Sequence, residues 1–504
     1  MKEYDAVIIG AGLGGLVAGA KLAKEGKKVV LLEQHYVVGG CSSTFTQKGF
    51  TVDVGLHLID GLDPHNPKIE IFKDLNVYEA IEPIRTGEFY RFINENIDIK
   101  IPDDIEEAKK VLSEKFPEEK KAIERYFDQI EGMYINVQKL PKNKLKMLLF
   151  MPLFPILYPY VVRWSKRTVA DLIEYSGLKN NDLIAALLAN IGFYGDDPNT
   201  LSALLFGVAQ GSYLTGGTYY LKGGSQKLAN HFAKVITDNG GEVMLNQLVT
   251  KVITKKGRAI GVEYRHREKP DEEPKKLYGK HIISDIAIPN LIKILPERES
   301  KILGKLYGDW EPNITYSSLY IGLKKPLKEL GNNAFSIFIW KGLKDWRKIA
   351  ESHRWPYEKR KFSLTDYSQV ETGMTVPGKG VANITIIDDY DEWAKLSKEE
   401  YKKRKEELTE ILLQKLEQAV PGAREYVEWY NCATPLTIEK FILTPKGTPL
   451  GFAQTPKQFM ERPRYKSKIP GLWHVGAWTF PGGGFTPAMQ SGYDCALQIL
   501  KESK

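Results

Sequence analysis

The feature that most constrains this chain is a glycine-rich turn directly after its first apolar segment. Residues 4–9, YDAVII, have the β-branched character of a strand, and the letters GAGLGG then place Gly10, Gly12 and Gly15 in the spacing GxGxxG. The segment LVAGAKLAKEG follows with apolar residues at helical period, and the strand-like KKVVLLE ends in Glu33. This order predicts a strand, a helix and a second strand, which is the context in which such a turn binds a dinucleotide.

The residue types in this turn each suit a physical task. Gly10 permits the tight turn, Gly12 lets the backbone approach a pyrophosphate, and Gly15 lets the helix pack closely on the strand. The helix N-terminus offers unpaired N–H groups and a partial positive charge to the phosphates, and Glu33 lies where a carboxylate binds ribose hydroxyls. The alternative is a glycine turn that serves packing alone.

The length of the chain requires more than one core. At 504 residues it exceeds the size at which a single core stops growing, so we expect at least two domains, built from discontinuous segments where necessary. Hydrophobic residues make up 42% and charged residues 27%, without low-complexity runs, which is typical of a folded globular protein.

Charge and cysteine content narrow the function class. The net charge is +8, but Lys and Arg alternate with Asp and Glu, as in EKFPEEKKAIER, which favours anionic lipid over nucleic acid as a partner. Cys41, Cys432 and Cys495 are too widely spaced for a disulfide framework or a metal cluster, so a reducing cytoplasm and no metal are expected. The sequence contains no HExxH, paired CxxC, P-loop or GxSxG motif, and it has one GxGxxG in a strand–helix context.

Residues 142–167, KNKLKMLLFMPLFPILYPYVVRWSKR, form an apolar segment with basic and aromatic flanks. The charge-free core, residues 147–162, is shorter than the roughly 20 residues that span a bilayer, and its prolines would break a straight helix. The pattern is typical of a segment that lies in the lipid headgroup region, and it predicts peripheral (monotopic) membrane association. A buried wall of a substrate cavity and a dimer contact are the alternatives.

The later chain alternates again between helix and strand patterns. After a Gly-Gly pair, Ser225 is the expected N-cap of a helix, and a strand and a hairpin follow it. Beyond residue 289, strand-like segments precede a long helix that opens with a capping box, Ser397 with Glu400. A sheet under helices would suit a long apolar cavity. The aromatic residues of this region are interpreted chiefly as core: Tyr316, Tyr320, Phe335, Phe338 and Trp340.

Two further segments resemble one superfamily of flavoproteins. The stretches LEQHYVVGGCSSTFTQKGFTVDVGLHLIDG and GLWHVGAWTFPGGGFTPAMQSG resemble the start and the end of the FAD-dependent oxidoreductases of the phytoene desaturase, carotenoid isomerase and retinol saturase superfamily. Phytoene desaturases proper usually carry an Arg after the first Gly-Gly pair and a later Gly-Pro pair. Here Cys41 and the letters DVGLHLI stand in those places, so the chain looks nearer to the isomerase and saturase branches.

The resemblance implies a resident FAD and assigns its contacts. Gly39 and Gly40 would touch the phosphates, Val249 the adenine, and a helix with Thr486 as N-cap and Pro487 first would point at the flavin ring. Many relatives have an acidic residue where this chain has Ala477, which puts that one hydrogen bond in doubt. The expected cofactor-binding residues are Gly10, Ala11, Gly12, Gly14, Gly15, Glu33, Gln34, Gly39, Gly40, Cys41, Ser42, Val249, Gly476, Ala477, Thr486 and Met489.

The expected fold is α/β, a two-domain flavoprotein. Residues 1–100, 213–288 and 431–504 are expected to form a discontinuous Rossmann-like FAD-binding domain. Residues 101–212 and 289–430 are expected to form a mixed-sheet and helical domain for substrate and membrane contact.

The resemblance implies action on carbon–carbon double bonds of a carotenoid, a retinoid or a related isoprenoid lipid, by desaturation, saturation or cis–trans isomerisation. With one dinucleotide motif, electrons would pass to or from a quinone, oxygen or a redox protein. No catalytic residue stands out, because the flavin carries the electron chemistry. His57 is the candidate for proton transfer or substrate orientation, and the alternative is a hydrogen bond within the loop. Cys41 is expected only to pack against the pyrophosphate.

Two other function classes remain open. A flavin amine oxidase shares the two-domain plan, but it would need a cationic substrate, which the apolar segment disfavours. A non-catalytic protein that binds prenyl groups or lipids on the same fold would have little need for Glu33 and an intact pyrophosphate loop.

Overall fold

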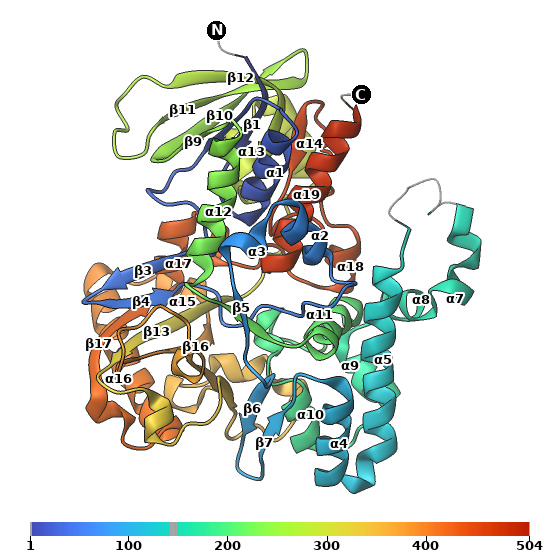
Figure 1. The fold of residues 1–504 in the computed structure, drawn as a ribbon, viewed down its shortest axis with the longest axis vertical. Helices are drawn as coiled ribbons and strands as arrows, with labels where there is room; N and C mark the ends of the chain where they lie inside the picture. The colour runs from blue at the N-terminus through green and yellow to red at the C-terminus, as the bar shows by residue number, and fades with distance from the viewer. Residues whose placement is uncertain (1–2, 142–146, 148, 503–504) are drawn as a thin grey trace.

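The computed structural model describes residues 3–141, 147 and 149–502, and in these residues two large sheets organise the chain (Figure 1). The first sheet has seven strands in the order β10-β11-β12-β1-β2-β9, with β18 paired to β12. Its strands are β1 (Glu3–Ile9), β2 (Val29–Leu32), β9 (Glu242–Met244), β10 (Gln247–Lys255), β11 (Arg258–His266), β12 (Lys275–Ser284) and β18 (Leu472–His474). The pairs β18-β12-β1-β2-β9 are parallel, and β10 and β11 form an antiparallel hairpin.

Both faces of the first sheet are covered, because alternate residues of its parallel strands point to opposite sides. Ile8 and Leu31 belong to a core that includes helices α1 (Leu13–Lys24), α12 (Ser225–Asp238) and α19 (Phe485–Glu502). Their neighbours Val7 and Val30 pack on the other side with α13 (Ile288–Ile294) and α14 (Glu297–Tyr307).

The second sheet also has seven strands, in the order β17-β13-β16-β15-β14-β6-β7. They are β6 (Tyr90–Ile93), β7 (Asp98–Ile101), β13 (Thr315–Leu323), β14 (Ser336–Ile339), β15 (Phe362–Asp366), β16 (Gly380–Asp388) and β17 (Val427–Ala433). Leu319, Ile384 and Ile386 pack against the long helix α16 (Lys398–Ala419). The capping box that was expected at Ser397 and Glu400 opens this helix and is confirmed.

Further helices and two short sheets complete the fold around the two large sheets. The remaining helices are α2 (Pro67–Asp74), α3 (Val77–Ala80), α4 (Ile105–Lys115), α5 (Lys120–Gln138), α7 (Phe154–Leu157), α8 (Pro159–Trp164), α9 (Val169–Ser176), α10 (Asn181–Leu187), α11 (Ala203–Gly216), α15 (Tyr390–Ala394), α17 (Pro435–Ile442) and α18 (Pro456–Met460). Strand β3 (Thr44–Gln47) pairs with β4 (Phe50–Asp53), and β5 (Pro83–Arg85) pairs with β8 (Tyr219–Leu221). Helix α7 lies away from the body of the molecule (Figure 1).

The α/β class with a Rossmann-like unit and a mixed second sheet is confirmed. The strands fall across two of the expected boundaries, since β6 and β7 within residues 90–101 and β17 within 427–433 belong to the second sheet. The division of the chain into domains remains a prediction. Among the described residues no helix is long and apolar enough to cross a bilayer.

The expected cap of helix α12 is wrong in its detail. The helix starts at Ser225 itself, with Gly224 in the capping position. The Asp53 carboxylate accepts hydrogen bonds from the Ser225 backbone N–H at 2.8 Å and from its hydroxyl at 2.6 Å. A residue 172 positions away therefore caps this helix, which a local sequence pattern does not reveal.

Candidate cofactor and substrate site

The carboxyl ends of the parallel strands bring the sequence-predicted motifs together. In the register of the sheet, Ile9 of β1 is paired with Leu32 of β2 and with Ser284 of β12. Gly10, Glu33 and Asp285 therefore follow three adjacent strands at one edge. This edge is where open α/β sheets bind their ligands.

A cavity of about 2560 Å³ begins at this edge and extends to the second sheet. Its walls include Gly10 and Glu33 at one end and Phe338, Trp340 and Lys361 at the other. Pockets for a single small ligand typically measure about 300–1,000 Å³. The volume is thus sufficient for a dinucleotide and an apolar substrate together.

The glycines of the first turn have the tight geometry that the motif predicts. Gly10 has a φ of 94°, which favours glycine. A Cβ atom built on Gly15 would lie 2.3 Å from the carbonyl oxygen of Gly10, so only glycine allows α1 to start this close to β1. A Cβ on Gly12 would lie 2.6 Å from the Asp285 Oδ2 atom.

The second glycine pair lies against the first turn. Gly39 forms a parallel bridge with Gly12, and its N–H donates to the carbonyl oxygen of Ala11 at 2.7 Å. Gly39 and Gly40 both have positive φ angles, 118° and 58°, which fits their glycine identity. The predicted phosphate-binding segments thus form one continuous backbone surface.

Glu33 stands at the end of β2 with 7% of its surface exposed. Its Oε2 accepts from the Ala11 N–H at 2.7 Å, and its Oε1 accepts from the His35 N–H at 2.8 Å. Burial raises the pKa of this carboxyl, and the two N–H donors oppose that shift. Because the side chain also lines the cavity, its remaining lone pairs are available to hydroxyl groups.

The two ends of the chain meet beside this loop. A Cβ on Gly14 would lie 2.5 Å from the backbone nitrogen of Gly476, and a Cβ on Gly492 would lie 2.1 Å from the carbonyl oxygen of Gly14. The Ser491 hydroxyl accepts from the Gly476 N–H at 2.7 Å and so fixes the loop to α19. The C-terminal glycine motif therefore packs directly against the N-terminal one, and both line the same cavity.

Thr486 is not the N-cap that the sequence suggested. Helix α19 already starts at Phe485, so Thr486 lies inside its first turn and Pro487 is not the first helical residue. The Thr486 hydroxyl donates instead to Asp60 Oδ1 at 2.5 Å. Asp60 also accepts from Ser212 at 2.6 Å and contacts the Nζ atom of Lys68 at 3.2 Å. Thr486 still lines the cavity, but its side chain holds a buried polar cluster.

Thirteen of the sixteen expected cofactor-binding residues line the cavity. They are Gly10, Gly12, Gly14, Glu33, Gln34, Gly39, Gly40, Cys41, Ser42, Val249, Gly476, Ala477 and Thr486. Ala11, Gly15 and Met489 lie behind this surface and are buried. Burial raises the pKa of the Cys41 thiol to about 12, so the residue is a neutral thiol and suits a packing task.

Asp285 is the residue of this site that sequence reasoning missed. It follows β12, and its Oδ2 accepts from the Gly15 N–H at 2.8 Å, inside the glycine turn. Burial, reinforced by the nearby charge of Glu33, raises its pKa to about 7 although backbone N–H groups oppose the shift. No sequence motif contains this residue. Its position after a central parallel strand was the one signal that could have found it.

His57 lies in the cavity wall with a defined hydrogen bond. The Tyr367 hydroxyl donates to the carbonyl oxygen of Leu56 at 3.0 Å and is 3.1 Å from Nδ1 of His57. Because that hydroxyl proton is already engaged, Nδ1 carries the hydrogen and Nε2 is the basic atom. Burial lowers the pKa of His57 to about 4, so the ring is neutral near pH 7.

The far part of the cavity is aromatic. Tyr316, Tyr320, Phe338 and Trp340 all line it, although they were interpreted chiefly as core. Phe335 is buried and lies outside the lining. The sequence pattern fails here because the same alternation places a residue on a sheet face whether that face meets a core or a cavity.

Comparisons with known proteins agree with this geometry. Residues 8–75 match a family described as an NAD(P)-binding Rossmann-like domain. The chain is 27% identical to the all-trans-retinol 13,14-reductase of Danio rerio, over 100% of this chain and 87% of that protein. It is 25% identical to the chloroplastic prolycopene isomerase of Daucus carota, over 99% of this chain and 80% of that protein. Among solved structures, putrescine oxidase bound to putrescine matches with a TM-score of 0.65 and 15% identity over 99% of both chains, a likeness of fold.

Proposed function

Because the chain belongs to the superfamily of flavin-dependent oxidoreductases that contains the phytoene desaturases, carotenoid isomerases and retinol saturases, we propose that it acts on carbon–carbon double bonds of an apolar isoprenoid. The relatives named for retinol and for prolycopene support a carotenoid or retinoid substrate. Saturation, desaturation and isomerisation share the same site and differ in their electron source.

The observation that carries the proposal is the continuity of the cavity. One space joins the glycine loops, which suit a dinucleotide, to an aromatic chamber with Tyr316, Phe338 and Trp340. An apolar substrate in this chamber would lie end-on to a cofactor that is bound at the glycine loops. The walls exclude water and orient the chain, which is most of what hydride transfer to an alkene requires of a protein.

The cofactor follows from the fold as a flavin-type group, and FAD is the specific proposal. The polar groups at this end of the cavity support it, because the lone pairs of Glu33 and the orphaned Oε1 atom of Gln34 can accept hydrogen bonds from ribose hydroxyls beside the glycine turn. The loop at Gly476 and the start of α19 would hold the ring end. When bound, FAD supplies hydride and electron transfer.

His57 is the side chain that we propose for proton handling. Its neutral ring presents Nε2 as a base, and the Nδ1 contact to Tyr367 fixes the ring orientation. A desaturation removes a proton as well as a hydride from the substrate, and the neutral Nε2 atom could accept that proton. In an isomerisation without net redox change, the same residue would only orient the substrate.

The experiment begins with the purified protein and FAD. A yellow holoprotein with a flavin absorbance band is expected, and incubation with poly-cis carotene, phytoene and retinol, each with and without a reductant, should convert at least one of them. Product analysis by chromatography separates saturation, desaturation and isomerisation. If the holoprotein changes none of the three under either condition, the proposed function is wrong.

An amine oxidase activity is the less favoured alternative. The likeness to putrescine oxidase is one of fold at 15% identity. In the cavity the carboxylate of Asp60 is already held by Lys68, Ser212 and Thr486, so it is not available for a substrate ammonium group. An assay for amine-dependent peroxide should therefore be negative.

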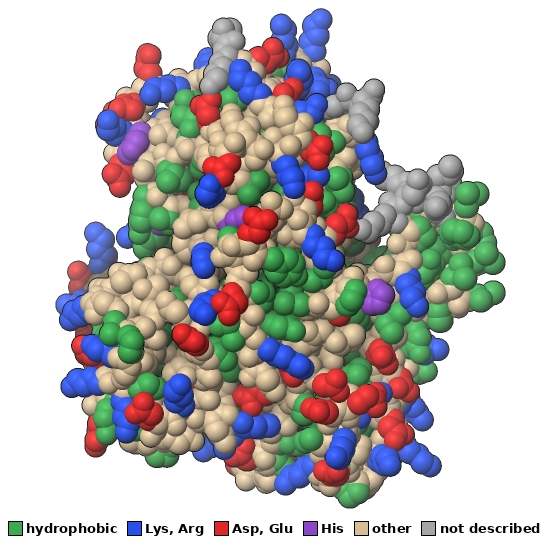
Figure 2. All heavy atoms as spheres, in the orientation of Figure 1, with side chains coloured by type: hydrophobic (Ala, Val, Ile, Leu, Met, Phe, Trp, Pro, Cys, Tyr) green, Lys and Arg blue, Asp and Glu red, His purple; other side chains and the backbone are tan. Residues whose placement is uncertain are grey.

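We also propose that the protein associates peripherally with membranes, as a cytoplasmic protein, and exchanges electrons with a quinone, oxygen or a redox protein. Ile156 and Leu149 are 76% and 67% exposed. Helix α7, which contains Ile156, lies away from the body in Figure 1, and a green apolar projection stands at that place in Figure 2. Exposed Lys166 and Arg167 follow it. The expected contacts of residues 142–146 lie outside the described residues.

A further inference from the structure

The floor of the aromatic chamber is the second sheet, whose register places its side chains in rows. Ser363 is paired with Thr385 and Phe338, so these three share one row that faces the cavity. Two residues further along the strands, the next row carries Trp340, Lys361 and Ile387, and all three again line the cavity. Lys361 is thus the one basic side chain in two rows of hydroxyl and apolar groups.

Lys361 is deeply buried for a lysine, with 9% of its surface exposed. Its Nζ donates to the carbonyl oxygen of Ile349 at 3.2 Å and lies 4.6 Å from the centre of the Trp340 ring. Among the described residues, no carboxylate forms an ion pair with it. An ammonium group has three donors, so this amine lacks partners for two of them.

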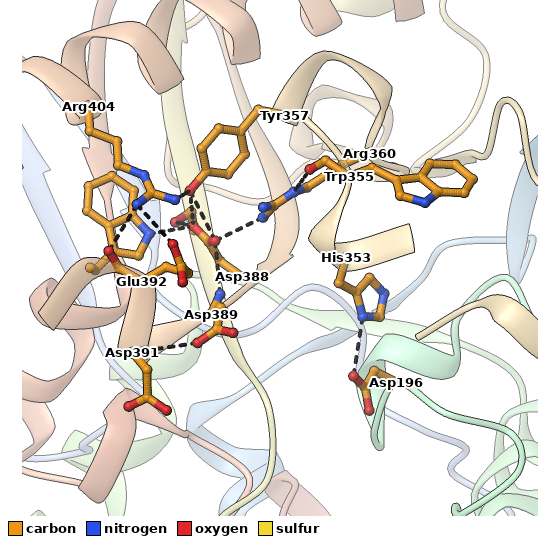
Figure 3. Close-up of polar contacts among 12 residues, drawn as sticks. Asp196, His353, Trp355, Tyr357, Arg360, Asp388, Asp389, Asp391, Glu392 and Arg404 are labelled. Carbon is orange, nitrogen blue, oxygen red and sulfur yellow. Dashed lines mark hydrogen bonds and ion pairs between the residues drawn. The ribbon is translucent and has the colours of Figure 1, made fainter. Parts of the chain in front are cut away.

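The adjacent residue, Arg360, is also a buried cation, but its charge has a carboxylate partner. Arg360 Nη1 is 2.9 Å from Oδ1 of Asp388, and its Nε donates to the Trp355 carbonyl oxygen at 2.8 Å (Figure 3). The charge of Asp196 acts on Lys361, but the Asp196 carboxylate itself contacts Nδ1 of His353 at 3.2 Å (Figure 3). Arg360 thus has a buried carboxylate paired with its charge, whereas among the described residues Lys361 has none in direct contact.

A buried, underpartnered amine is costly unless a ligand completes its hydrogen bonds. Desolvation lowers the pKa of Lys361 to about 7, so both of its protonation states are accessible, and each has N–H donors. A pure hydrocarbon offers such a group no acceptor. A hydroxyl, carbonyl or carboxylate oxygen does.

We propose that Lys361 binds an oxygen substituent at the end of the apolar substrate and thereby selects oxygen-bearing isoprenoids over hydrocarbons. This inference rests on the proposed function and names the substrate class within it. The Trp340 ring and the hydroxyls of Ser363 and Thr385 would flank the same end of the chain.

The register also gives the separation between Lys361 and the strand residues that lie next to the His57 loop. Thr365, Asn383 and Tyr320 form a row four residues from Lys361, and the Tyr320 hydroxyl donates to the Val54 carbonyl oxygen at 3.0 Å, next to the loop that carries His57. At about 3.3 Å per residue, four residues span roughly 13 Å. A substrate double bond that is held beside His57 would therefore lie several bonds away from the oxygen end of the substrate.

The test measures binding to the FAD-loaded protein by quenching of flavin fluorescence. The probes are all-trans-retinol, retinoic acid and the hydrocarbon with the same polyene but no oxygen. The wild type should bind the two oxygenated probes more tightly than the hydrocarbon. Lys361→Met should weaken their binding roughly tenfold or more, the typical effect of losing a hydrogen bond to a charged group, and should leave the hydrocarbon unchanged.

Lys415→Met is the matched control, because Lys415 is also buried but lies outside this cavity and donates to the carbonyl oxygens of Glu358 and Arg360. It should change none of the three affinities. Lys361→Gln keeps a donor, so it should retain retinol binding and lose the added affinity for the carboxylate. Lys361→Gln also tests the inference if Lys361→Met does not fold.

Equal binding of all three probes to the wild type, or equal loss of all three in Lys361→Met, would overturn this inference. If the hydrocarbon is bound and converted without any preference for oxygen, the inference fails while the proposed function stands. If no probe of either kind is bound, both fail.

Discussion

Asp285 shows how one unpredicted residue controls the chemistry of a predicted motif. Its carboxylate accepts from the Gly15 N–H at 2.8 Å, in the turn where the pyrophosphate of a dinucleotide would bind. A Cβ on Gly476 would lie 1.9 Å from its Oδ1 atom, so the C-terminal loop is also shaped around this carboxyl. The glycines thus make room for an internal acid as well as for a cofactor.

This arrangement predicts a pH-dependent affinity for FAD. The pKa of Asp285 is already raised to about 7, and a nearby pyrophosphate further disfavours the carboxylate. Binding then takes up a proton, and affinity should fall as pH rises above 7, by at most about tenfold per pH unit for one proton. Titrations of the apoprotein with FAD between pH 5.5 and 8.5 measure the slope.

Asp285→Asn should remove that slope and bind FAD more tightly than the wild type at pH 8. Asp238→Asn, at an exposed position at the end of α12, is the control and should keep the wild-type slope. Parallel curves for Asp285→Asn and the wild type would contradict the assignment.

His57 gives the second prediction at this scale. His57→Gln should lower kcat by about 100-fold, the lower end of what a positioned proton-transfer group contributes, while the flavin content stays the same. Because the pKa of His57 is lowered to about 4, the wild-type rate should show no titration of this group between pH 6 and 8. His266→Gln, on the β11 hairpin, should behave as the wild type. An unchanged kcat in His57→Gln would leave the residue a purely structural hydrogen-bond partner.

Single residues differ in how far the sequence predicts them. Gly10 and Gly15 could be assigned because the turn needs a positive φ and a close helix approach, and both are local requirements. Asp285, Lys361 and the contact of Thr486 with Asp60 could not. Each depends on a partner that the fold brings from a distant part of the chain.

At the scale of elements, α7 and α8 carry a prediction about membranes. Ile156→Glu should weaken binding to vesicles with anionic lipid roughly tenfold or more. Burial of an isoleucine side chain in the lipid contributes about 1.5–3 kcal/mol, and anionic lipid repels the glutamate that replaces it. Co-sedimentation with vesicles of neutral and anionic lipid measures the effect. Added salt should weaken the anionic component alone.

Val376→Glu is the matched control for this surface. Val376 is 53% exposed and precedes β16 of the second sheet, outside α7 and α8, so the same charge there should not affect vesicle binding. If both variants lose binding equally, net charge rather than this element governs attachment. If neither does, the projection contacts something other than lipid.

Elements with a strong local pattern were predictable, and their partners were not. Strand β1, helix α1 and the capping box of α16 follow from periodicity and cap chemistry. The pairing of β6 with β14, across residues 93 and 339, has no local signal because the hydrogen bonds between parallel strands specify no sequence. For this reason the expected boundary at residue 100 cuts through the second sheet.

At the scale of the whole molecule, the cavity is a product of long-range closure. Its cofactor end combines segments near Gly10, Gly39, Val249 and Gly476, which belong to distant parts of the chain. The resemblance of the first and last motifs to one superfamily was predictable from sequence and is confirmed by full-length relatives. The volume and the aromatic lining of the chamber were not, because they depend on how two sheets approach each other.

A ligand that binds these segments together should stabilise the folded chain by an amount set by its free concentration relative to its Kd. FAD that binds only the folded state adds about 4 kcal/mol at a free concentration of about 1,000 times its Kd, which should raise Tm by several degrees in a single transition. NAD lacks a group that would reach the loop at Gly476 and the start of α19, so it should bind more weakly than FAD and, at the same free concentration, raise Tm by a smaller amount. Differential scanning calorimetry of the apoprotein with each ligand at the same concentration compares the two shifts in Tm. An NAD shift equal to that of FAD would mean that the C-terminal glycine loop takes no part in the site, and the assignment of a flavin-type ligand to both glycine loops would have to be withdrawn.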